Sequence, residues 1–387
     1  MRFWLDRGVD GFRVDTVNKY SKPHEFKDVE VTDPDHFEQP SAHVYCNGPR
    51  VHEFINEMKE LVLDKYDAMT VGELSLTPDP DHVLRYVGAS QKQLDMVFHI
   101  DMGNMDHGDG PKTKYDHKPF VLPELKAAIS KWQKFIEGTD GWTTSFLENH
   151  DNGRAVSRYA SDEPQYREIS AKLLAMMEAS MTGTIFVYQG QEIGMINAPK
   201  SWPIEEYKDI EAINYYNEAK KLTEQFPDQK PSRLETVMNG LQILGRDHSR
   251  LPMQWDSSKN AGFSTGKPWM RTHDLYAEIN VERQRGDSDS VLSFWKRMIR
   301  LRKEHVDLFV YGIFDLVDAD NDNTFVFTKS SWDGKRKALI ALNFSKTRQA
   351  FKLTAHNGGW DLVLGNVQKG GEGSLAAFEG RIYLSRE

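Results

Sequence analysis

Short apolar runs that end on charged or polar residues alternate with longer stretches of helical spacing over most of the chain. The apolar runs predict strands at residues 9–15, 68–73, 94–100, 141–147 and 183–188. The helical spacing predicts helices at residues 49–62, 81–86, 123–137, 164–180 and 291–305. Strands that alternate with helices form parallel sheets, and polar residues at successive strand ends then share one edge. The pattern therefore predicts an α/β fold with one functional rim.

The number of strands predicts only part of a barrel. A closed (β/α)8 TIM barrel needs eight strands, and the five predicted here fit strands 4–8 of a partial barrel over residues 1–305. A long polar insertion follows the last strand at about residues 195–285, with a helix expected at 205–225. Alternating strands beyond it predict a small C-terminal all-β domain, a β-sandwich, over residues 306–387. Met1 lies inside a helical pattern without an N-cap residue, so we expect the chain to begin inside a longer protein.

Charge and composition narrow the function further. A net charge of -9 argues against nucleic acid and an anionic membrane as partners, because both require a basic face. Cys46 is the single cysteine, so there is no intrachain disulfide framework and no Cys-rich zinc site, which suits the cytoplasm. No apolar run approaches a membrane span of roughly 18 to 20 residues. The histidines contain no His-Glu-x-x-His motif, so we expect no metal and no cofactor.

Three carboxylates follow predicted strands, and their pattern suggests glycoside hydrolysis. Asp15, Glu73 and Asp151 each stand where a parallel strand ends. A retaining glycosidase needs one ionised carboxylate as nucleophile and one carboxylic acid as proton donor about 5 Å away. Arg13, two residues before Asp15, is expected to lower the pKa of that carboxyl, and the neighbouring carboxylates are expected to raise the pKa of Glu73. Asp151 and the adjacent His150 are then expected to bind sugar hydroxyls.

Five sequence strings carry a resemblance to a known family. The strings GFRVD at 11–15, VGEL at 71–74 and ENHD at 148–151 resemble, in this order, three regions of glycoside hydrolase family 13, the α-amylase family. QGQEIGM at 189–195 and GRDHSRLPMQW at 245–255 resemble its α-glucosidase branch, which includes maltases and oligo-1,6-glucosidases. The resemblance covers the whole chain.

The resemblance implies a role for each strand-end carboxylate. By the family's pattern, Asp15 is the nucleophile, Glu73 the acid/base and Asp151 the stabiliser of the transition state. Arg13 and His150 are implied as their direct partners. An isolated Arg-x-Asp after a strand is most often a loop salt bridge, so the assignment depends on all these positions occurring together.

Four more residues are implied as substrate-binding on weaker grounds. Glu192, Arg246 and Arg250 fall in segments that the family places around the substrate mouth, although a structural salt-bridge network would explain them equally well. Thr16 directly follows the proposed nucleophile, and in this branch a Thr there goes with α-1,4 preference and a Val with α-1,6. The alternative is that Thr16 only caps a turn.

The interpretation is a maltase-like α-glucosidase. We expect retaining, exo-acting hydrolysis of terminal α-1,4-linked glucose from maltose-type or sucrose-type oligosaccharides, by a monomer. The alternatives are an oligo-1,6-glucosidase, a sucrose isomerase or transglycosylase of the same family, and a noncatalytic relative that serves as an interaction module. The family's earlier motif with an Asp and a His does not occur in this sequence. Five of eight strands would leave two sheet edges with unpaired backbone groups, so we expect residues 1–387 alone to be prone to aggregation and inactive.

Overall fold

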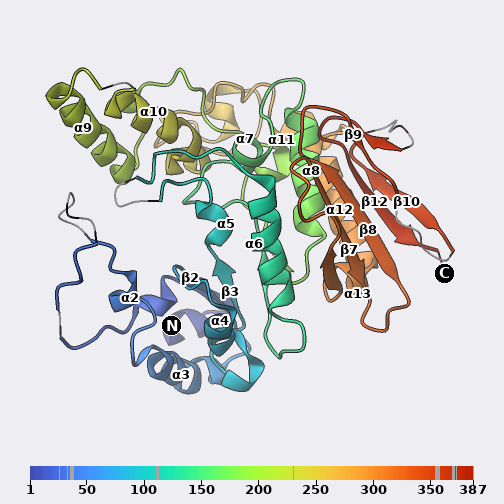
Figure 1. The fold of residues 1–387 in the computed structure, drawn as a ribbon, viewed down its shortest axis with the longest axis horizontal. Helices are drawn as coiled ribbons and strands as arrows, with labels where there is room; N and C mark the ends of the chain where they lie inside the picture. Colours follow the sequence, from blue (N-terminus) through green and yellow to red (C-terminus); the bar gives the residue numbers. More distant parts are fainter. Residues whose placement is uncertain are drawn as a thin grey trace. The chain divides into compact units, whose positions relative to one another are not determined.

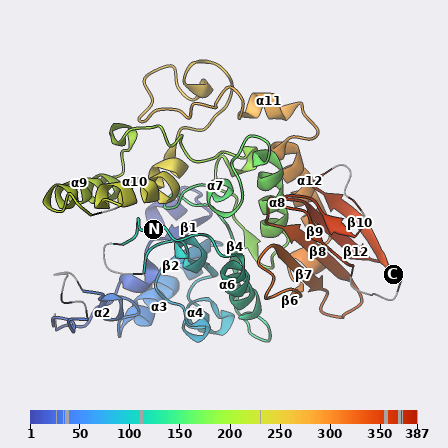
Figure 2. The ribbon, with the colours of Figure 1, turned by 45° about the horizontal axis from the view of Figure 1, so that its top comes forward.

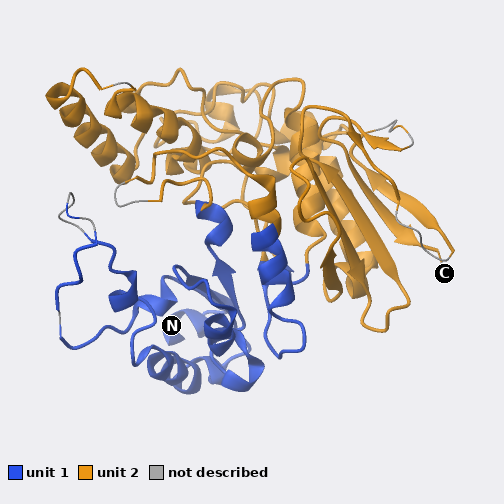
Figure 3. Cartoon of the chain, viewed as in Figure 1, with its two compact units in different colours: residues 1–104, 127–144, 182–184 blue, residues 105–126, 145–181, 185–387 orange. Residues whose placement is uncertain are grey.

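The chain folds into two compact units (Figure 3). The computed structural model describes residues 1–25, 27–32, 34, 39–109, 113–229, 231–353, 358–367, 371 and 373–386. The first unit consists of residues 1–104, 127–144 and 182–184, and the second of residues 105–126, 145–181 and 185–387. Figure 1 gives the order of the elements. The sequence predicted a domain boundary near residue 305, between the barrel part and the C-terminal β domain. The division into these two compact units does not test that boundary, which stays a proposal.

A parallel sheet organises the first unit. It has the order β1-β2-β3, formed by β1 (Gly11–Val14), β2 (Met69–Leu74) and β3 (Met96–His99). A side chain at Gly11 would collide with the carbonyl of Met69, so β1 approaches β2 closely because this position has no Cβ. The parallel pairing expected from the sequence is thus confirmed for these strands.

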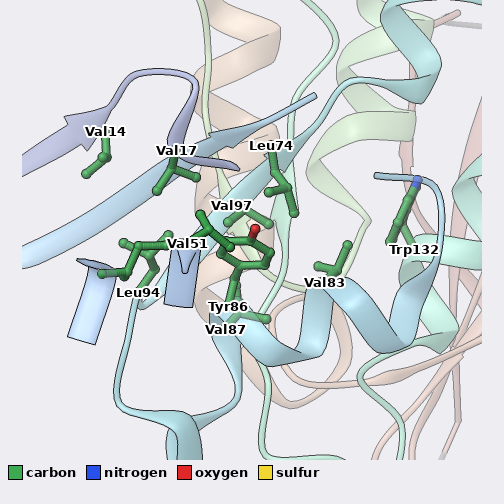
Figure 4. Packing of buried hydrophobic residues seen from close by; sticks show 11 residues of the cluster. Val14, Val17, Val51, Leu74, Val83, Tyr86, Val87, Leu94, Val97 and Trp132 are labelled. Carbon is green, nitrogen blue, oxygen red and sulfur yellow. The ribbon is translucent and has the colours of Figure 1, made fainter. Parts of the chain in front are cut away.

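Helices cover the sheet of the first unit and complete its core. These are α3 (Val51–Leu61), α4 (Pro80–Val87) and the end of α6 (Leu122–Lys134). Figure 4 shows the core cluster, which contains Val14, Val17, Val51, Leu74, Val83, Tyr86, Val87, Leu94, Val97 and Trp132. The Asp79 side chain caps α4 by accepting a hydrogen bond from the Asp81 amide at 2.9 Å. Packing of β-branched residues from the strands against these helices fixes the strand ends.

The fourth and fifth strands are shorter than the sequence predicted. β4 (Thr144–Ser145) and β5 (Thr184–Ile185) pair with each other in a two-stranded sheet. The predictions of strands over 141–147 and 183–188 were wrong in extent. An apolar run indicates that a segment is buried, whereas a strand also requires a ladder of hydrogen bonds to a neighbouring strand.

A buried helix, an amphipathic helix that packs on it and a helical hairpin belong to the second unit. α8 (Arg167–Ala179) packs on α12 (Val291–Glu304) and contacts strands of the C-terminal sheet. In the predicted insertion, α9 (Ile210–Gln225) and α10 (Arg233–Leu244) lie side by side (Figures 1 and 2). The sequence did not predict α10. A side chain at its Gly240 would collide with the Tyr115 carbonyl, so the glycine permits close packing there.

An antiparallel sheet ends the chain, as expected. It has the strand order β10-β12-β8-β7-β6, and a two-stranded sheet of β9 and β11 accompanies it. The strands are β6 (Ile313–Leu316), β7 (Thr324–Ser330), β8 (Lys337–Asn343), β9 (Gln349–Ala350), β10 (Trp360–Gly365), β11 (Ser374–Leu375) and β12 (Gly380–Ser385). The remaining α-helices described are α1 (Arg2–Leu5), α2 (Ala42–Tyr45), α5 (Asp101–Asn104), α7 (Ala155–Tyr159), α11 (Val281–Arg285) and α13 (Val306–Phe309). Among the described residues, no helix is both long and apolar enough to cross a membrane.

Candidate active site

Asp15 and Glu73 meet at the carboxyl ends of β1 and β2 through one guanidinium group. Arg13 Nη1 donates to Asp15 Oδ1, and Arg13 Nη2 donates to Glu73 Oε2 at 2.6 Å. The Asp15 side chain is 73% exposed and that of Glu73 14%. The sequence predicted the contact of Arg13 with Asp15 but not the one with Glu73. One carboxylate of the pair is thus open to solvent and the other is largely enclosed.

Thr16 occupies a strained turn directly after Asp15. Its φ of 39° and ψ of 45° are left-handed, which is uncommon for a β-branched residue. This conformation directs the Thr16 amide toward Glu73 Oε2, at a distance of 3.4 Å. Thr16 also begins the 3-10 helix η1 (Val17–Lys19), but its side chain makes no capping hydrogen bond there. The turn therefore places the Thr16 backbone next to both carboxylates, and a role of the Thr16 side chain in linkage choice stays a prediction.

Asp151 is the centre of a cluster of charged groups in the second unit. Arg250 Nη2 donates to Asp151 Oδ1 at 2.9 Å, and Arg246 Nε lies 3.5 Å from the same oxygen. His150 Nε2 lies 3.4 Å from Asp151 Oδ2. Arg250 Nε also donates to the His150 carbonyl at 2.8 Å. The structure thus brings Asp151 and His150 together with Arg246 and Arg250, which the sequence had predicted separately and on weaker grounds.

Asp209 belongs to the same cluster and was missed by the sequence reasoning. Its Oδ1 accepts a hydrogen bond from Arg250 Nη1 at 3.3 Å and lies 3.9 Å from Arg246 Nη1. Its side chain is only 5% exposed. Glu211 Oε2 lies 3.5 Å from Arg246 Nε. The signal that could have found Asp209 is its position as a helix N-cap, just before the apolar spacing of α9 begins.

A buried ion pair joins the loops that carry this cluster. Arg154 Nη1 donates to Glu148 Oε2 at 2.8 Å and to the Gln189 carbonyl at 2.8 Å, and Nη2 donates to the Ser249 carbonyl at 3.5 Å. Both charged side chains are 1% exposed. Burial raises the pKa of Glu148, and the guanidinium of Arg154 opposes that rise. Three loops, each next to a predicted site residue, are therefore fixed to one side chain.

Glu192 is held within its own loop. Its Oε2 accepts a hydrogen bond from the Gly190 amide at 2.7 Å. A sugar contact for Glu192 stays a prediction. So does the meeting of Asp15, Glu73 and Asp151 at one rim, because the first two belong to one compact unit and the third to the other. Among the described residues, no group of His, Cys, Asp or Glu side chains could hold a metal ion.

Glycoside hydrolysis depends on a pair of carboxylates, and Asp15 and Glu73 provide such a pair at the ends of two parallel strands. The family to which the chain belongs agrees with a site for glycoside hydrolysis. The model described as "Alpha amylase, catalytic domain" matches residues 1–312, and the chain belongs to that family.

Proteins similar to the chain include glucosidases and an isomaltulose synthase. An alpha-glucosidase of Candida albicans is 45% identical over 386 residues, which cover 99% of this chain and 66% of that protein. The oligo-1,6-glucosidase of Parageobacillus thermoglucosidasius is 43% identical over 358 residues, which cover 92% of this chain and 60% of that protein. The crystal structure of isomaltulose synthase from Klebsiella sp. LX3 matches with a TM-score of 0.87 and 33% identity, over 100% of this chain and 67% of that chain. The chain thus spans about 60 to 66% of the length of these two curated relatives.

Proposed function

We propose that the chain carries the catalytic residues of a retaining α-glucosidase that removes terminal α-1,4-linked glucose from maltose-type or sucrose-type oligosaccharides. The observation that carries the proposal is the guanidinium of Arg13, which contacts both Asp15 and Glu73. Two carboxylates on one guanidinium suit the separation of about 5 to 5.5 Å that retention requires. The identity of the relatives supports glucose as the sugar.

The proposed reaction has two steps. First, the ionised carboxylate of Asp15 attacks the anomeric carbon while Glu73 gives its proton to the leaving glycosidic oxygen. A covalent glucosyl ester of Asp15 forms, and the rest of the oligosaccharide leaves as an alcohol. Second, Glu73 takes a proton from water, and the resulting hydroxide attacks the anomeric carbon and frees Asp15. No cofactor enters this scheme.

Asp151 has a different proposed role, which is to stabilise the transition state. Its carboxylate would hold sugar hydroxyls, and His150 would add a second hydrogen-bonding group. Arg246 and Arg250 both contact Oδ1 of Asp151. They therefore set the direction from which a sugar hydroxyl can bind this carboxylate. We further propose that β1 to β5 correspond to strands 4–8 of a TIM barrel, in a cytoplasmic monomer.

Other activities of this family use the same covalent intermediate. An oligo-1,6-glucosidase differs in the linkage that it accepts, whereas an isomerase or transglycosylase passes the glucosyl group to a sugar hydroxyl rather than to water. The isomaltulose synthase neighbour makes the isomerase the second candidate. A noncatalytic relative is the less favoured reading, because all three carboxylates are present.

A hybrid protein tests the function. Residues 1–387 replace the matching segment of the Candida albicans relative, which supplies the part of its own length that this chain does not cover. We expect the hybrid to release glucose from maltose, with α-glucose as the first product in proton NMR spectra. The intact relative is the control. Release of β-glucose first would contradict the retaining mechanism, a new disaccharide from sucrose would favour the isomerase, and an inactive hybrid would count against the proposed function.

Thr16→Val in the same hybrid tests the linkage preference. The side chain of Thr16 follows the proposed nucleophile in a strained turn, so a change there alters the space beside the attacked carbon. We expect the ratio of kcat/KM for isomaltose to kcat/KM for maltose to rise, by about 10-fold or less. The two residues are nearly isosteric and both β-branched, so folding stability provides the internal control. An unchanged ratio would leave Thr16 an ordinary turn residue.

A further inference from the structure

The carboxylate of Asp209 is buried beneath the two arginines that contact Asp151. Such a group requires compensation, because a buried charge without partners costs several kcal/mol. Asp209 has two kinds of partner. Its Oδ2 accepts a hydrogen bond from the Ala212 amide at the start of α9, at 3.2 Å, and its Oδ1 faces Arg250 and Arg246.

Attachment of this segment does not require the Asp209 carboxylate. The buried Asp247 already holds it, because Asp247 Oδ1 accepts hydrogen bonds from the backbone amides of Lys208 and of Asp209, the latter at 3.1 Å. A serine or asparagine would also cap α9 as well as an aspartate does. The negative charge of Asp209 is therefore available for another task.

We propose that Asp209 is a positioning residue that sets the electrostatic environment of Asp151. Arg250 is shared between the two carboxylates, through Nη1 to Asp209 and through Nη2 to Asp151. Arg246 lies between the same pair, at 3.9 and 3.5 Å. Asp209 thus holds both guanidinium groups in place and takes up part of their charge, which leaves Asp151 more of its own charge for the substrate.

The inference rests on the proposed function and has a mechanistic consequence. If Asp209 is removed, Asp151 becomes the main counter-charge for Arg250 and shares Arg246 with Glu211, and both guanidinium groups then move toward Asp151. A carboxylate neutralised in this way stabilises the developing positive charge of the oxocarbenium-like transition state less well. Because this charge develops only in the transition state, the loss falls on kcat more than on KM.

Asp209→Ser tests the proposal, since a serine hydroxyl keeps the cap of α9 but cannot reach both arginines. In the hybrid we expect kcat/KM for maltose to fall by up to about 100-fold, mainly through kcat. Asp209→Asn retains an acceptor and should lose less. The matched control is Asp79→Ser, the same change at the N-cap of α4, which contacts neither arginine and should keep kcat.

Two results would overturn the inference. One is an Asp209→Ser hybrid with kcat within about twofold of the unsubstituted hybrid. The other concerns the chain of residues 1–387 itself and needs no activity: a crystal structure of its Asp209→Ser variant in which Arg246 and Arg250 keep their positions against Asp151. An inactive unsubstituted hybrid would instead count against the proposed function, and the crystal structure would still decide the role of Asp209.

Discussion

Asp15→Asn in the hybrid is expected to lower kcat for maltose by on the order of 10⁴-fold or more, because the variant lacks the attacking carboxylate. Stability should change by less than about 0.5 kcal/mol, since the side chain is 73% exposed and Arg13 keeps its contact with Glu73. The matched control is Asp10→Asn, at the exposed residue just before β1, which should keep full activity. Substantial maltase activity in the Asp15→Asn hybrid would contradict the assignment of the nucleophile.

Azide separates the roles of the two carboxylates. In an Asp15→Ala hybrid given α-glucosyl fluoride, azide can attack the anomeric carbon from the vacated side as fluoride leaves, so the product is β-glucosyl azide. In a Glu73→Ala hybrid, Asp15 still forms the glucosyl ester, and azide displaces it to give α-glucosyl azide. Opposite configurations of the two products are therefore expected. The same configuration from both variants would show that the roles are assigned wrongly.

The strand-end carboxylates could be predicted because their positions follow from local pattern. A strand places residues i and i+2 on the same face, so the sequence could predict that the side chains of Arg13 and Asp15 lie next to each other. The second contact of Arg13 was not, because Glu73 is 60 residues away and only the pairing of β1 with β2 brings it close. Short-range periodicity carries no information on which side chain a long arginine reaches across a sheet.

The charged cluster around Asp151 shows a second limit on what can be predicted from the sequence. Arg246 and Arg250 were predicted as site residues through a motif, whereas Asp209 was placed inside a helix expected over 205–225. In the structure that region is a 3-10 turn followed by α9, and Asp209 is the cap between them. Helix boundaries depend on capping contacts that periodicity does not resolve. Glu192 also comes from a motif. The structure shows that its carboxylate accepts a hydrogen bond from the Gly190 amide, and the sugar contact that the motif suggested stays a prediction.

Arg154→Met is expected to destabilise the chain by about 3 to 5 kcal/mol, the typical cost of leaving one member of a buried ion pair without its partner. The variant leaves Glu148 buried and removes the donor to the carbonyls of Gln189 and Ser249. Urea unfolding of the chain of residues 1–387 measures the loss. The control is Arg50→Met, which breaks the exposed ion pair with Glu53 and should leave the urea midpoint unchanged.

The pH dependence of this loss identifies its cause. Burial raises the pKa of Glu148 in the folded chain above its usual value of 4.5, and removal of Arg154 raises it further. A folded state that binds more protons than the unfolded state loses stability as pH rises from the unfolded pKa to the folded pKa. The stability of Arg154→Met should therefore be closest to that of the wild type near pH 4.5 and fall further below it as pH rises.

Glu148→Gln combined with Arg154→Met should remove this pH slope and recover part of the stability. The uncompensated charge is gone in the double variant, while the two carbonyls still lack their donor. If the double variant is as unstable at mildly alkaline pH as Arg154→Met alone, the buried charge of Glu148 is not the cause, and the lost hydrogen bonds to the Gln189 and Ser249 loops account for the whole effect.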